Sequence, residues 1–443
     1  MILPMMIQQV LAITVSTADS MMIAKAGEEA VSGVSLVGTL DVLLVIAFSS
    51  MVTGGTVAIA HALGRQERAF GCECAKQLVY ITLIISVMVA LPVGIFRSPL
   101  LSLLYGQAEE KVLVCANDYL RIMVISFPFL ALYESGVAIF RTMGDTVTGL
   151  VLSVIANILN VVGNAVFIFA FQMGAAGAAL ATLIARAVCA VIIMAMICNK
   201  KRTVHIERLF YYRPHKGVIK KILNIGVPHG IESSMFQVGK LATQILISTM
   251  GTAGIAANSV ANTFASYLYL PAGAISNATI TVVGRCYGAG EKEQAKKYAK
   301  LLLRWTFVCM WVVSAGLLLF SKPLIGIYNL SEEGAKIAFD ITLIHLIATC
   351  LIRPFAFSLP STFKAAGDVR FSMVVSTISM WTIRVGGSYL IAPESFTVFG
   401  ITVPALGMGI IGVWVAMIGD WVLRTVLYAY RFYKDIWLVK GKK

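Results

Sequence analysis

The strongest constraint on the fold of this chain is the recurrence of apolar runs that are each about 20 residues long, which is the length a helix needs to cross roughly 30 Å of hydrocarbon. Hydrophobic residues make up 58% of the 443 positions and charged residues only 13%. A soluble globular domain of this length does not have such a composition. The sequence therefore predicts an all-α polytopic membrane protein.

We expect about twelve membrane-spanning helices of this length. The first run, Met1–Ala24, has neither a charged segment at its start nor a small-residue cleavage site, so we interpret it as a retained span rather than a signal peptide. The expected spans lie at residues 1–24, 33–59, 77–96, 117–140, 147–171, 174–197, 223–249, 256–283, 301–320, 336–358, 371–392 and 407–433.

Lys and Arg are distributed unevenly between alternate loops. If the N-terminus lies inside the cell, the basic residues of the outside segments are Lys25, Arg97, Lys111, Lys322 and Lys336. The other loops hold the basic clusters, above all the segment NKKRTVHIERLFYYRPHKGVIKK at Asn199–Lys221. Because positively charged loops stay in the cytoplasm, this asymmetry predicts a cell-membrane protein with both termini cytoplasmic. The same loops account for the net charge of +14, so we expect no nucleic-acid partner.

The two halves of the chain resemble each other in sequence. Pro4 aligns with Pro228, and we expect both to lie at the start of a helix. The segments ALGRQERA, FRTMGD and GAAGAALA of the first half align, in the same order, with AGEKEQA, FKAAGD and GIIGVWVA of the second half. We therefore predict an N-terminal six-helix lobe (1–198), a basic cytoplasmic linker (199–221) and a C-terminal six-helix lobe (222–443), related by a pseudo-two-fold axis.

A parallel two-lobe repeat is an architecture of secondary transporters. The chain has no G-x-x-x-x-G-K-[ST] motif, so an ion gradient is the natural energy source. It has no H-E-x-x-H or G-x-S-x-G motif, so we expect no enzyme. Cys72 and Cys74 are close in sequence, but C-x-C alone lacks metal-ligand spacing, and we expect no metal and no cofactor. A channel is a further alternative, although the sequence has no filter-like segment.

Several motifs resemble those of the MATE (multidrug and toxic compound extrusion) transporters. They include LPMMIQQVL and ADSMMIAKAG in the first span, FRTMGDT, NILNVVGNAVFIFAF, IGVPHGIESSMFQVGKL, FKAAGDVRFS and GVWVAMIGDWVLR, and together they cover nearly the whole chain. The resemblance implies two six-helix lobes that form a V, and export of amphipathic organic cations or other small molecules driven by H⁺ or Na⁺. Two features depart from the family pattern: the short segment before Pro4, and Lys364 where Arg is usual.

Asp19 is the only charged residue in the first span up to Ala24. An ionised carboxylate within hydrocarbon costs about 2.5 kcal/mol or more, so a helix that served only as an anchor would not carry it. Asp19 either binds H⁺ or Na⁺, or its side chain reaches the interface. The resemblance favours the first reading, because Asp19 matches the carboxylate thought to bind the coupling cation.

The resemblance extends this cation-coupling site to Asn160, Asn164 and Thr182. Asn160 and Asn164 are four residues apart and so lie on one face of a helix, with Asn157 a turn earlier. Many relatives appear to carry Asp where this chain has Asn164, so the site here would hold one carboxylate instead of two. The alternative is that the three asparagines only hydrogen-bond to neighbouring helices.

Other ionisable residues lie inside the expected spans of the first lobe. Asp41 and Glu134 are secondary candidates for substrate binding, and Glu134 would suit a cationic substrate. We expect Arg186 to pair with one of these acids, because an unpaired charge at this depth is expensive. A purely structural ion pair is an equal alternative for either acid.

The second lobe lacks the acid pair that some relatives use, since Phe236 and Arg353 stand at those positions. Glu232 is a candidate for cation or substrate binding, the alternative being a Glu232–Lys240 pair or a role at the helix end. Asp420 and Arg424, four residues apart, are predicted to form a structural ion pair. Asn258 and Tyr267 are candidates for a weakly specific organic ligand, with helix packing as the alternative.

Taken together, the sequence predicts a monomeric, cation-coupled antiporter that exports amphipathic organic cations, drugs or metabolites by alternating access. The nearest rival is a flippase or exporter of lipid-linked or polysaccharide precursors, which would share the two-lobe plan. That rival would favour a strongly cationic cavity and often extra spans, and the sequence indicates neither.

Overall fold

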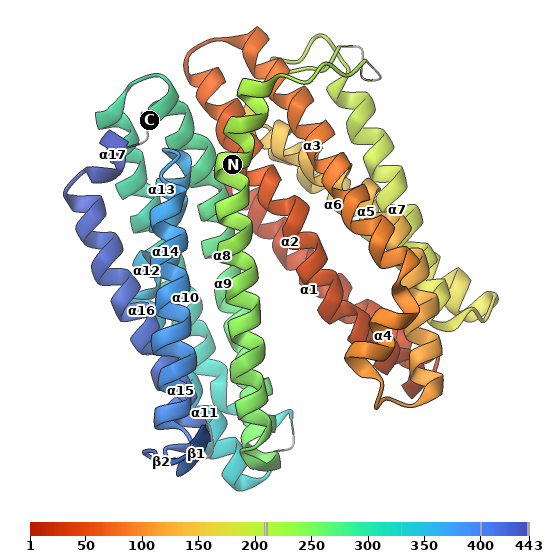
Figure 1. The fold of residues 1–443 in the computed structure, drawn as a ribbon, viewed down its shortest axis with the longest axis vertical. Helices are drawn as coiled ribbons and strands as arrows, with labels where there is room; N and C mark the ends of the chain where they lie inside the picture. The colour runs from red at the N-terminus through yellow and green to blue at the C-terminus, as the bar shows by residue number, and fades with distance from the viewer. Residues whose placement is uncertain (208, 210, 329, 399–400, 441–443) are drawn as a thin grey trace. The chain divides into compact units, whose positions relative to one another are not determined.

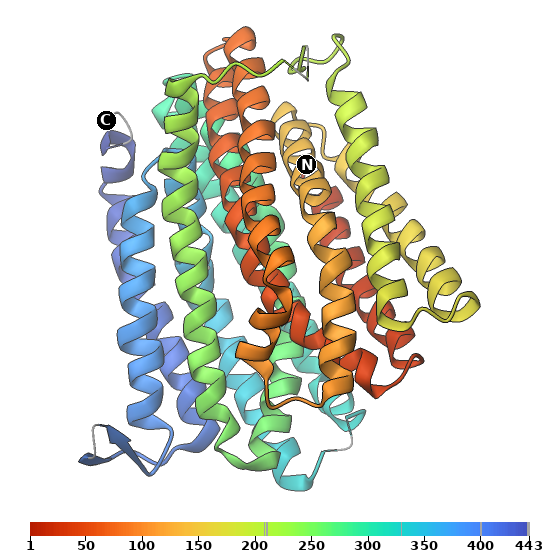
Figure 2. The same cartoon turned by 45° about the vertical axis from the view of Figure 1, so that its right-hand side comes forward.

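The structure is a computed structural model of the chain, and it describes residues 1–207, 209, 211–328, 330–398 and 401–440. For residues 396–398, 401–403 and 440 the description covers the backbone only. Contacts divide the chain into two compact units, Met1–Gly230 and Ile231–Lys443, and each is described by itself. Both units are built from long helices, as the sequence predicts (Figures 1 and 2).

The first unit consists of helices that run nearly the full length of the predicted spans. They are α1 (Ile2–Ala24), α2 (Glu28–Gly64), α3 (Arg68–Ile95), α4 (Arg97–Tyr105), α5 (Glu110–Met143), α6 (Val147–Asn164), the π-helix η1 (Ala165–Ala170), α7 (Gly174–Ile197) and the first part of α8 (Lys216–Ser248). The short α4 was not expected, and α2 and α5 extend several residues beyond the predicted limits because regular helix continues into polar residues such as Glu28 and Glu110.

The second unit begins with the rest of α8. It continues with α9 (Gly251–Gly288), α10 (Lys292–Gly326), α11 (Glu332–Leu351), α12 (Arg353–Phe357), α13 (Leu359–Ala365), α14 (Val369–Ser379), the π-helix η2 (Met380–Gly386), α15 (Gly387–Ile391), the strands β1 (Ser395–Val398) and β2 (Ile401–Pro404), α16 (Gly409–Tyr433) and α17 (Ile436–Lys440). The strands pair antiparallel, with Ser395 opposite Pro404. This small hairpin is the only sheet among the described residues.

Nine helices in the described part of the chain are long and apolar enough to cross a membrane. The other three predicted spans fall on α8, on α9 and on the continuous segment from α14 to α15. These segments include polar residues such as Lys240, Asn258 and Arg384, which lower their mean hydropathy. They are nevertheless continuous helical segments of span length, so the predicted number of spans agrees with the helical architecture.

The division between the units falls inside α8 rather than in the basic segment at 199–221. The reason is packing, because the start of α8 belongs to the core of the first unit: Val218 and Ile222 are fully buried with Ile59 and Leu78. A Cβ atom on Gly54 of α2 would lie 2.4 Å from the carbonyl oxygen of Ile222. Residues 216–221 of the predicted linker are therefore the first turns of a helix.

Two expectations about proline-containing segments are wrong. Pro228 lies well inside α8, which starts at Lys216, so it does not mark the start of a helix as Pro4 does. The predicted span at 336–358 is broken at Ile352 and again at Ser358, each just before the first turn of a helix that contains Pro354 or Pro360. Proline has no N–H to donate to the carbonyl oxygen four residues earlier, and its ring clashes with that carbonyl, which explains both breaks.

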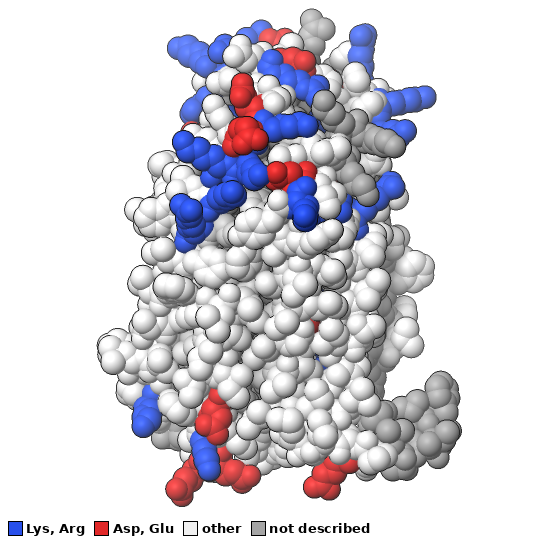
Figure 3. All heavy atoms as spheres, turned by 90° about the vertical axis from the view of Figure 1, so that its left-hand side faces the viewer, with Lys and Arg blue, Asp and Glu red and all other residues white. Residues whose placement is uncertain are grey.

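Charged side chains are unevenly placed on the surface. On the face that Figure 3 shows, Lys and Arg gather at one end, a broad band without charge occupies the middle, and the other end carries mainly Asp and Glu. Exposed apolar side chains, such as Leu319, Val312 and Trp311, also lie on α10. Such a band is what a lipid-facing surface requires.

Candidate functional site

Four polar side chains form a continuous hydrogen-bonded chain inside the first unit. The Asn164 side-chain amide donates to Oδ1 of Asp19 at 2.6 Å and lies 3.5 Å from Oδ1 of Asn160. The Asn160 amide donates to the hydroxyl of Thr182 at 3.0 Å. The Thr182 hydroxyl in turn donates to the carbonyl oxygen of Ala178 at 3.0 Å. The four residues predicted as the cation-coupling site are therefore brought together, and we call them the Asp19 cluster.

Three helices supply this cluster: α1 carries Asp19, α6 carries both asparagines, and α7 carries Thr182. Small residues let α6 and α7 approach closely, since a Cβ atom on Gly163 would lie 2.8 Å from Cβ of Ala181. Close contact of this kind between membrane helices depends on small side chains. It brings the Thr182 hydroxyl within reach of Asn160.

The cluster is well shielded. Asn164 is 1% exposed and Asn160 is 7% exposed, while Asp19 and Thr182 are half-buried. Oδ1 of Asn164 is buried and has no hydrogen-bond partner within the described chain. A buried acceptor without a donor is unfavourable unless a cation or a proton donor satisfies it. The cluster thus offers one carboxylate, amide oxygens and a hydroxyl to a small cation.

Asn157 stands apart from this cluster. It lies on α6, two turns before Asn164, and its side-chain nitrogen is buried without a hydrogen-bond partner among the described residues. The hydrogen-bonded chain that includes Asn160 and Asn164 therefore does not reach Asn157.

The other two candidate acids of the first unit, Asp41 and Glu134, lie near Arg186. Its guanidinium interacts electrostatically with Asp41 of α2 and with Glu134 of α5, and Glu134 also interacts with Arg141. Arg186 nevertheless donates its hydrogen bond to the Ser126 hydroxyl at 2.7 Å. Among the described residues it forms no ion pair within 4.0 Å, so the predicted direct pairing with an acid is wrong.

Glu232 in the second unit has a different partner from the one considered from the sequence. Its Oε2 lies 3.1 Å from Nζ of Lys364 on α13, and its Oε1 accepts a hydrogen bond from the Ser376 hydroxyl at 3.1 Å. Both charged side chains are largely buried, with 13% and 10% of their surface exposed. The pair joins α8 to α13 and does not involve Lys240. Sequence reasoning noted Lys364 only as a departure from the family pattern.

Asp420 and Arg424 of α16 form the predicted ion pair, with Nε of Arg424 2.7 Å from Oδ1 of Asp420. Ser379 of α14 also donates to this carboxylate, and Arg424 donates to the Ser376 carbonyl oxygen. All of these contacts are buried, which supports a structural role for the pair.

The two remaining candidates, Asn258 and Tyr267, lie on α9 but differ in environment. Asn258 is 4% exposed, and its Oδ1 accepts a hydrogen bond from the Trp414 indole at 3.1 Å. Tyr267 is 44% exposed. Tyr269, two residues later, is half-buried; its hydroxyl lies 3.1 Å from Nε2 of His345 and its ring lies under Arg353.

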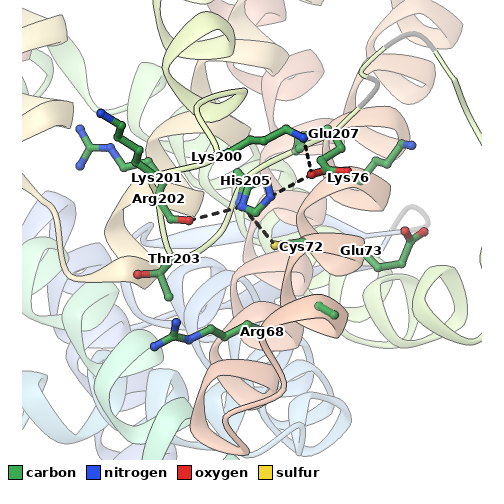
Figure 4. Close-up of a pocket in the computed structure, with 12 residues that line it drawn as sticks. Arg68, Cys72, Glu73, Lys76, Lys200, Lys201, Arg202, Thr203, His205 and Glu207 are labelled. Carbon is green, nitrogen blue, oxygen red and sulfur yellow. Dashed lines mark hydrogen bonds and ion pairs between the residues drawn. The ribbon is translucent and has the colours of Figure 1, made fainter.

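A separate pocket of about 630 Å³ lies where the segment after α7 crosses the start of α3 (Figure 4). His205 lies at its centre, with its backbone N–H donating to Sγ of Cys72 at 3.4 Å and its ring 3.6 Å from Glu207. A hydrogen bond and the charge of Lys200 lower the pKa of the exposed Glu207. Within the described residues no three His, Cys, Asp or Glu side chains gather closely enough to hold a metal ion.

The chain is similar in sequence to a known family of proteins and to several of its members. The MatE family model matches the chain twice, over residues 4–166 and again over residues 228–390. The protein described as "Uncharacterized transporter YisQ" of Bacillus subtilis is 28% identical over 447 residues, which cover 99% of this chain and 94% of that protein. "Probable multidrug resistance protein NorM" of Thermotoga maritima is 26% identical over 456 residues, covering 98% and 91%.

Solved structures share the fold. A MOP superfamily transporter from Pyrococcus furiosus, described with the words "Reverse polarity of binding pocket suggests different function", has a TM-score of 0.84 at 21% identity and covers 100% of this chain and 95% of its own. A MATE family transporter of the MOP superfamily in an outward-facing conformation has a TM-score of 0.85 at 20% identity, with coverage of 98% and 94%. At these identities the likeness concerns the fold alone.

Proposed function

Because this chain belongs to the MATE family of transporters, matched by the family model in both of its halves, we propose that it exports small amphipathic organic molecules from the cell by alternating access, driven by an inward gradient of H⁺ or Na⁺. It is a multi-pass membrane transporter and not an enzyme. The proposal concerns its coupling ion, its substrates and its orientation.

The observation that carries the proposal is the Asp19 cluster. Asp19 is the only acid in α1, and its carboxylate reaches two other helices through Asn164 and Asn160. A cation or proton that binds to the carboxylate changes the hydrogen bonding of α1, α6 and α7 together. A ligand shifts a conformational equilibrium only if it binds one state better than the other, and a site shared by three helices supplies such a difference.

The working cycle then depends on competition. The ion enters from outside, neutralises the charge of Asp19 and favours the state from which the substrate leaves. An organic cation is the natural first substrate, because Asp41 and Glu134 add negative charge to the same unit. The excess of Lys and Arg in alternate loops supports cytoplasmic termini in the cell membrane.

A second candidate function is export of lipid-linked or polysaccharide precursors. One structural observation favours it, since the second unit gathers Lys240, Arg353 and Arg384 among its helices. The sequence alone indicated no such cationic cluster. The number of spans does not exceed the usual plan, which keeps small-molecule export as the first candidate.

The test is efflux of ethidium from proteoliposomes under an imposed pH gradient or an imposed Na⁺ gradient. We expect efflux under one of the two gradients for the wild type and a loss of at least tenfold for Asp19→Asn. Asp118→Asn is the matched control, because it removes the same charge from an exposed position on α5, and it should retain efflux.

Equal activity of Asp19→Asn and the wild type would refute coupling at Asp19 and direct attention to Glu134. An absence of efflux for any organic cation would favour the lipid-linked precursors. We also propose that one chain is the working unit, because it contains both halves of the repeat. Light scattering of the purified protein should then give the mass of a single chain, and a dimer mass would contradict this.

A further inference from the structure

Basic side chains outnumber acidic ones inside the helices of the second unit. Lys240 of α8 and Arg384 of η2 lie close enough to repel each other, and Arg384 is also repelled by Arg353 of α12. The acids among these helices have direct partners elsewhere, since Asp420, which also attracts Arg384, pairs with Arg424, and Glu232 pairs with Lys364. Positive charge without a direct ion-pair partner within a membrane region is unfavourable and indicates a functional site.

Arg353 is compensated by aromatic rings. Its guanidinium lies 3.5 Å from the centre of the Tyr269 ring and 4.7 Å from that of Phe357, and the side chain is buried. Cation–π contacts of this closeness replace a counter-ion. We therefore assign Arg353 a structural role.

Arg384 and Lys240 have no cation–π contact as close as these. The only cation–π contact of Arg384 among the described residues is with Phe236, at 5.4 Å, and a single face at that distance compensates a guanidinium weakly. Nε of Arg384 is buried and has no hydrogen-bond partner in the described part of the chain. Neither Arg384 nor Lys240 forms an ion pair within 4.0 Å among those residues.

Both side chains line one pocket of about 50 Å³, together with the carboxamides of Gln244 and Asn258 and the indole of Trp414. The indole N–H can only donate, so it fixes Asn258 with its oxygen toward Trp414 and its two N–H donors turned away. One of these donors lies 3.5 Å from Oε1 of Gln244, a long contact. The pocket thus combines two cationic side chains with a buried amide donor.

From this arrangement we propose that the pocket between Lys240, Arg384 and Asn258 binds the anionic head, a carboxylate or a phosphate, of an amphipathic organic molecule. A guanidinium and an ammonium at one site match the two oxygens of such a group. The volume admits a head group but not a drug-sized molecule, which needs roughly 300 Å³ or more. The apolar part of the ligand therefore lies beyond the pocket, next to side chains such as Met417.

The proposal rests on the proposed function only in taking the bound anion to be a transported molecule. The head group belongs either to a free organic anion or to a lipid, and the two share the same recognition chemistry. Because the Asp19 cluster lies in the other unit, the anion bound at this pocket need not carry a positive charge as well.

The experiment measures binding of two fluorescent probes to the purified full-length protein in neutral detergent, by anisotropy with protein-free micelles subtracted. Dansylglycine carries a carboxylate and dansylcadaverine carries an ammonium on the same fluorophore. We expect dansylglycine to bind more tightly. Arg384→Gln and Lys240→Gln should each weaken its binding roughly tenfold or more, since each removes a charge-assisted hydrogen bond.

Two variants separate binding from general damage. Arg384→Lys keeps the charge and should retain binding within roughly threefold if the pocket recognises an anion. Arg304→Gln removes an arginine from an exposed position on α10 and should bind as the wild type does. Equal binding of the two probes, unchanged binding by Arg384→Gln, or the same loss in Arg304→Gln would overturn the proposal.

Lipid nanodiscs identify the source of the head group. If binding of dansylglycine is weaker in phosphatidylglycerol than in phosphatidylcholine for the wild type but not for Arg384→Gln, an anionic lipid head occupies the pocket. If the two lipids give equal binding, the ligand is a free organic anion. Binding requires no ion gradient, so Asp19→Asn should keep it, and a failure of coupled efflux and a failure of this site can be told apart.

Discussion

At the scale of single residues, the properties of Asp19 depend on the amide that holds it. The hydrogen bond from Asn164 at 2.6 Å stabilises the ionised carboxylate, and the unpaired Oδ1 of Asn164 provides a further acceptor for a cation. Where a second carboxylate would raise the charge of such a site, this chain has a neutral amide. The affinity of the Asp19 cluster for an ion therefore depends more on where its oxygen atoms lie than on its net charge.

The first prediction concerns Asn164→Ala. It removes a charge-assisted hydrogen bond worth about 1.5–3 kcal/mol, so the concentration of coupling ion that gives half-maximal efflux should change by roughly tenfold or more. Efflux from proteoliposomes at graded pH or graded Na⁺ measures this. Asn157→Ala, on the same helix but outside the cluster, should stay within about twofold. Equal effects of the two variants would count against the cluster as the ion site.

The second prediction concerns the buried pair of Glu232 and Lys364. Glu232→Gln removes the carboxylate next to a lysine whose side chain is 10% exposed, and breaking such a pair from one side typically costs about 3 kcal/mol. The midpoint of thermal unfolding in detergent should fall clearly. The double variant Glu232→Gln with Lys364→Gln should recover part of the loss, because no uncompensated charge remains.

Glu207→Gln is the matched control for this prediction. Glu207 pairs with Lys200 at 3.0 Å, but both side chains are more than half exposed, so solvent screens the pair. Its lowered pKa means that any contribution to stability is present above the ordinary glutamate pKa and is lost as the pH falls through the value in the folded protein. If Glu207→Gln lowers the unfolding midpoint as much as Glu232→Gln does, the buried pair has no special role.

At the scale of helices, glycine decides how closely elements pack. Gly54 of α2 contacts the backbone of α8 at Ile222, whereas Gly38, on the same helix, has open space where a Cβ atom would lie. The two glycines therefore serve different purposes. Gly54 permits a close approach of two helices, and Gly38 adds nothing to packing.

The third prediction compares these two positions. In Gly54→Ala the added Cβ would lie 2.4 Å from a carbonyl oxygen that cannot rotate away, so α2 and α8 must separate at a cost of about 1–3 kcal/mol. Gly38→Ala should be neutral or stabilising, by up to about 1 kcal/mol, since alanine is the better helix former. Thermal unfolding in detergent checks both, and equal midpoints would contradict the close packing.

At the scale of the whole molecule, the distribution of charge decides how the chain inserts. The fourth prediction uses this asymmetry. In a cysteine-depleted background, Gln107→Cys, in the turn after α4, should react with a membrane-impermeant maleimide in intact cells. Lys200→Cys, in the basic segment after α7, should react only after the membrane is permeabilised. The reverse pattern would place both termini outside.

The sequence predicted most of the fold because its strongest signals are local. A run of apolar residues specifies a membrane helix regardless of its neighbours, and the repeat shows where the first half recurs in the second. The breaks before Pro354 and Pro360 could also have been predicted, since a proline cannot continue the hydrogen bonding of the helix that precedes it. They were missed because hydropathy continues through them.

Part of the candidate site could also be predicted from the sequence, and part of it could not. Asp19 is identified by its charge within an apolar span, and the family resemblance added Asn160, Asn164 and Thr182, so the Asp19 cluster was expected before its geometry was known. Two contacts were not expected from the sequence: the hydrogen bond from Arg186 to Ser126 and the ion pair of Glu232 with Lys364. These partners are far apart in the chain, and which side chains meet depends on how each helix is rotated.

The sequence by itself thus determined the class of molecule, its helical spans, its internal repeat and the acid at its first-unit site, because composition and periodicity act within single helices. Only the tertiary structure decided that the start of α8 belongs to the first unit, and that Lys240 and Arg384 line one pocket without an ion-pair partner among the described residues. The physical reason is that burial and pairing of a charge depend on neighbours contributed by other helices, and linear spacing does not specify them.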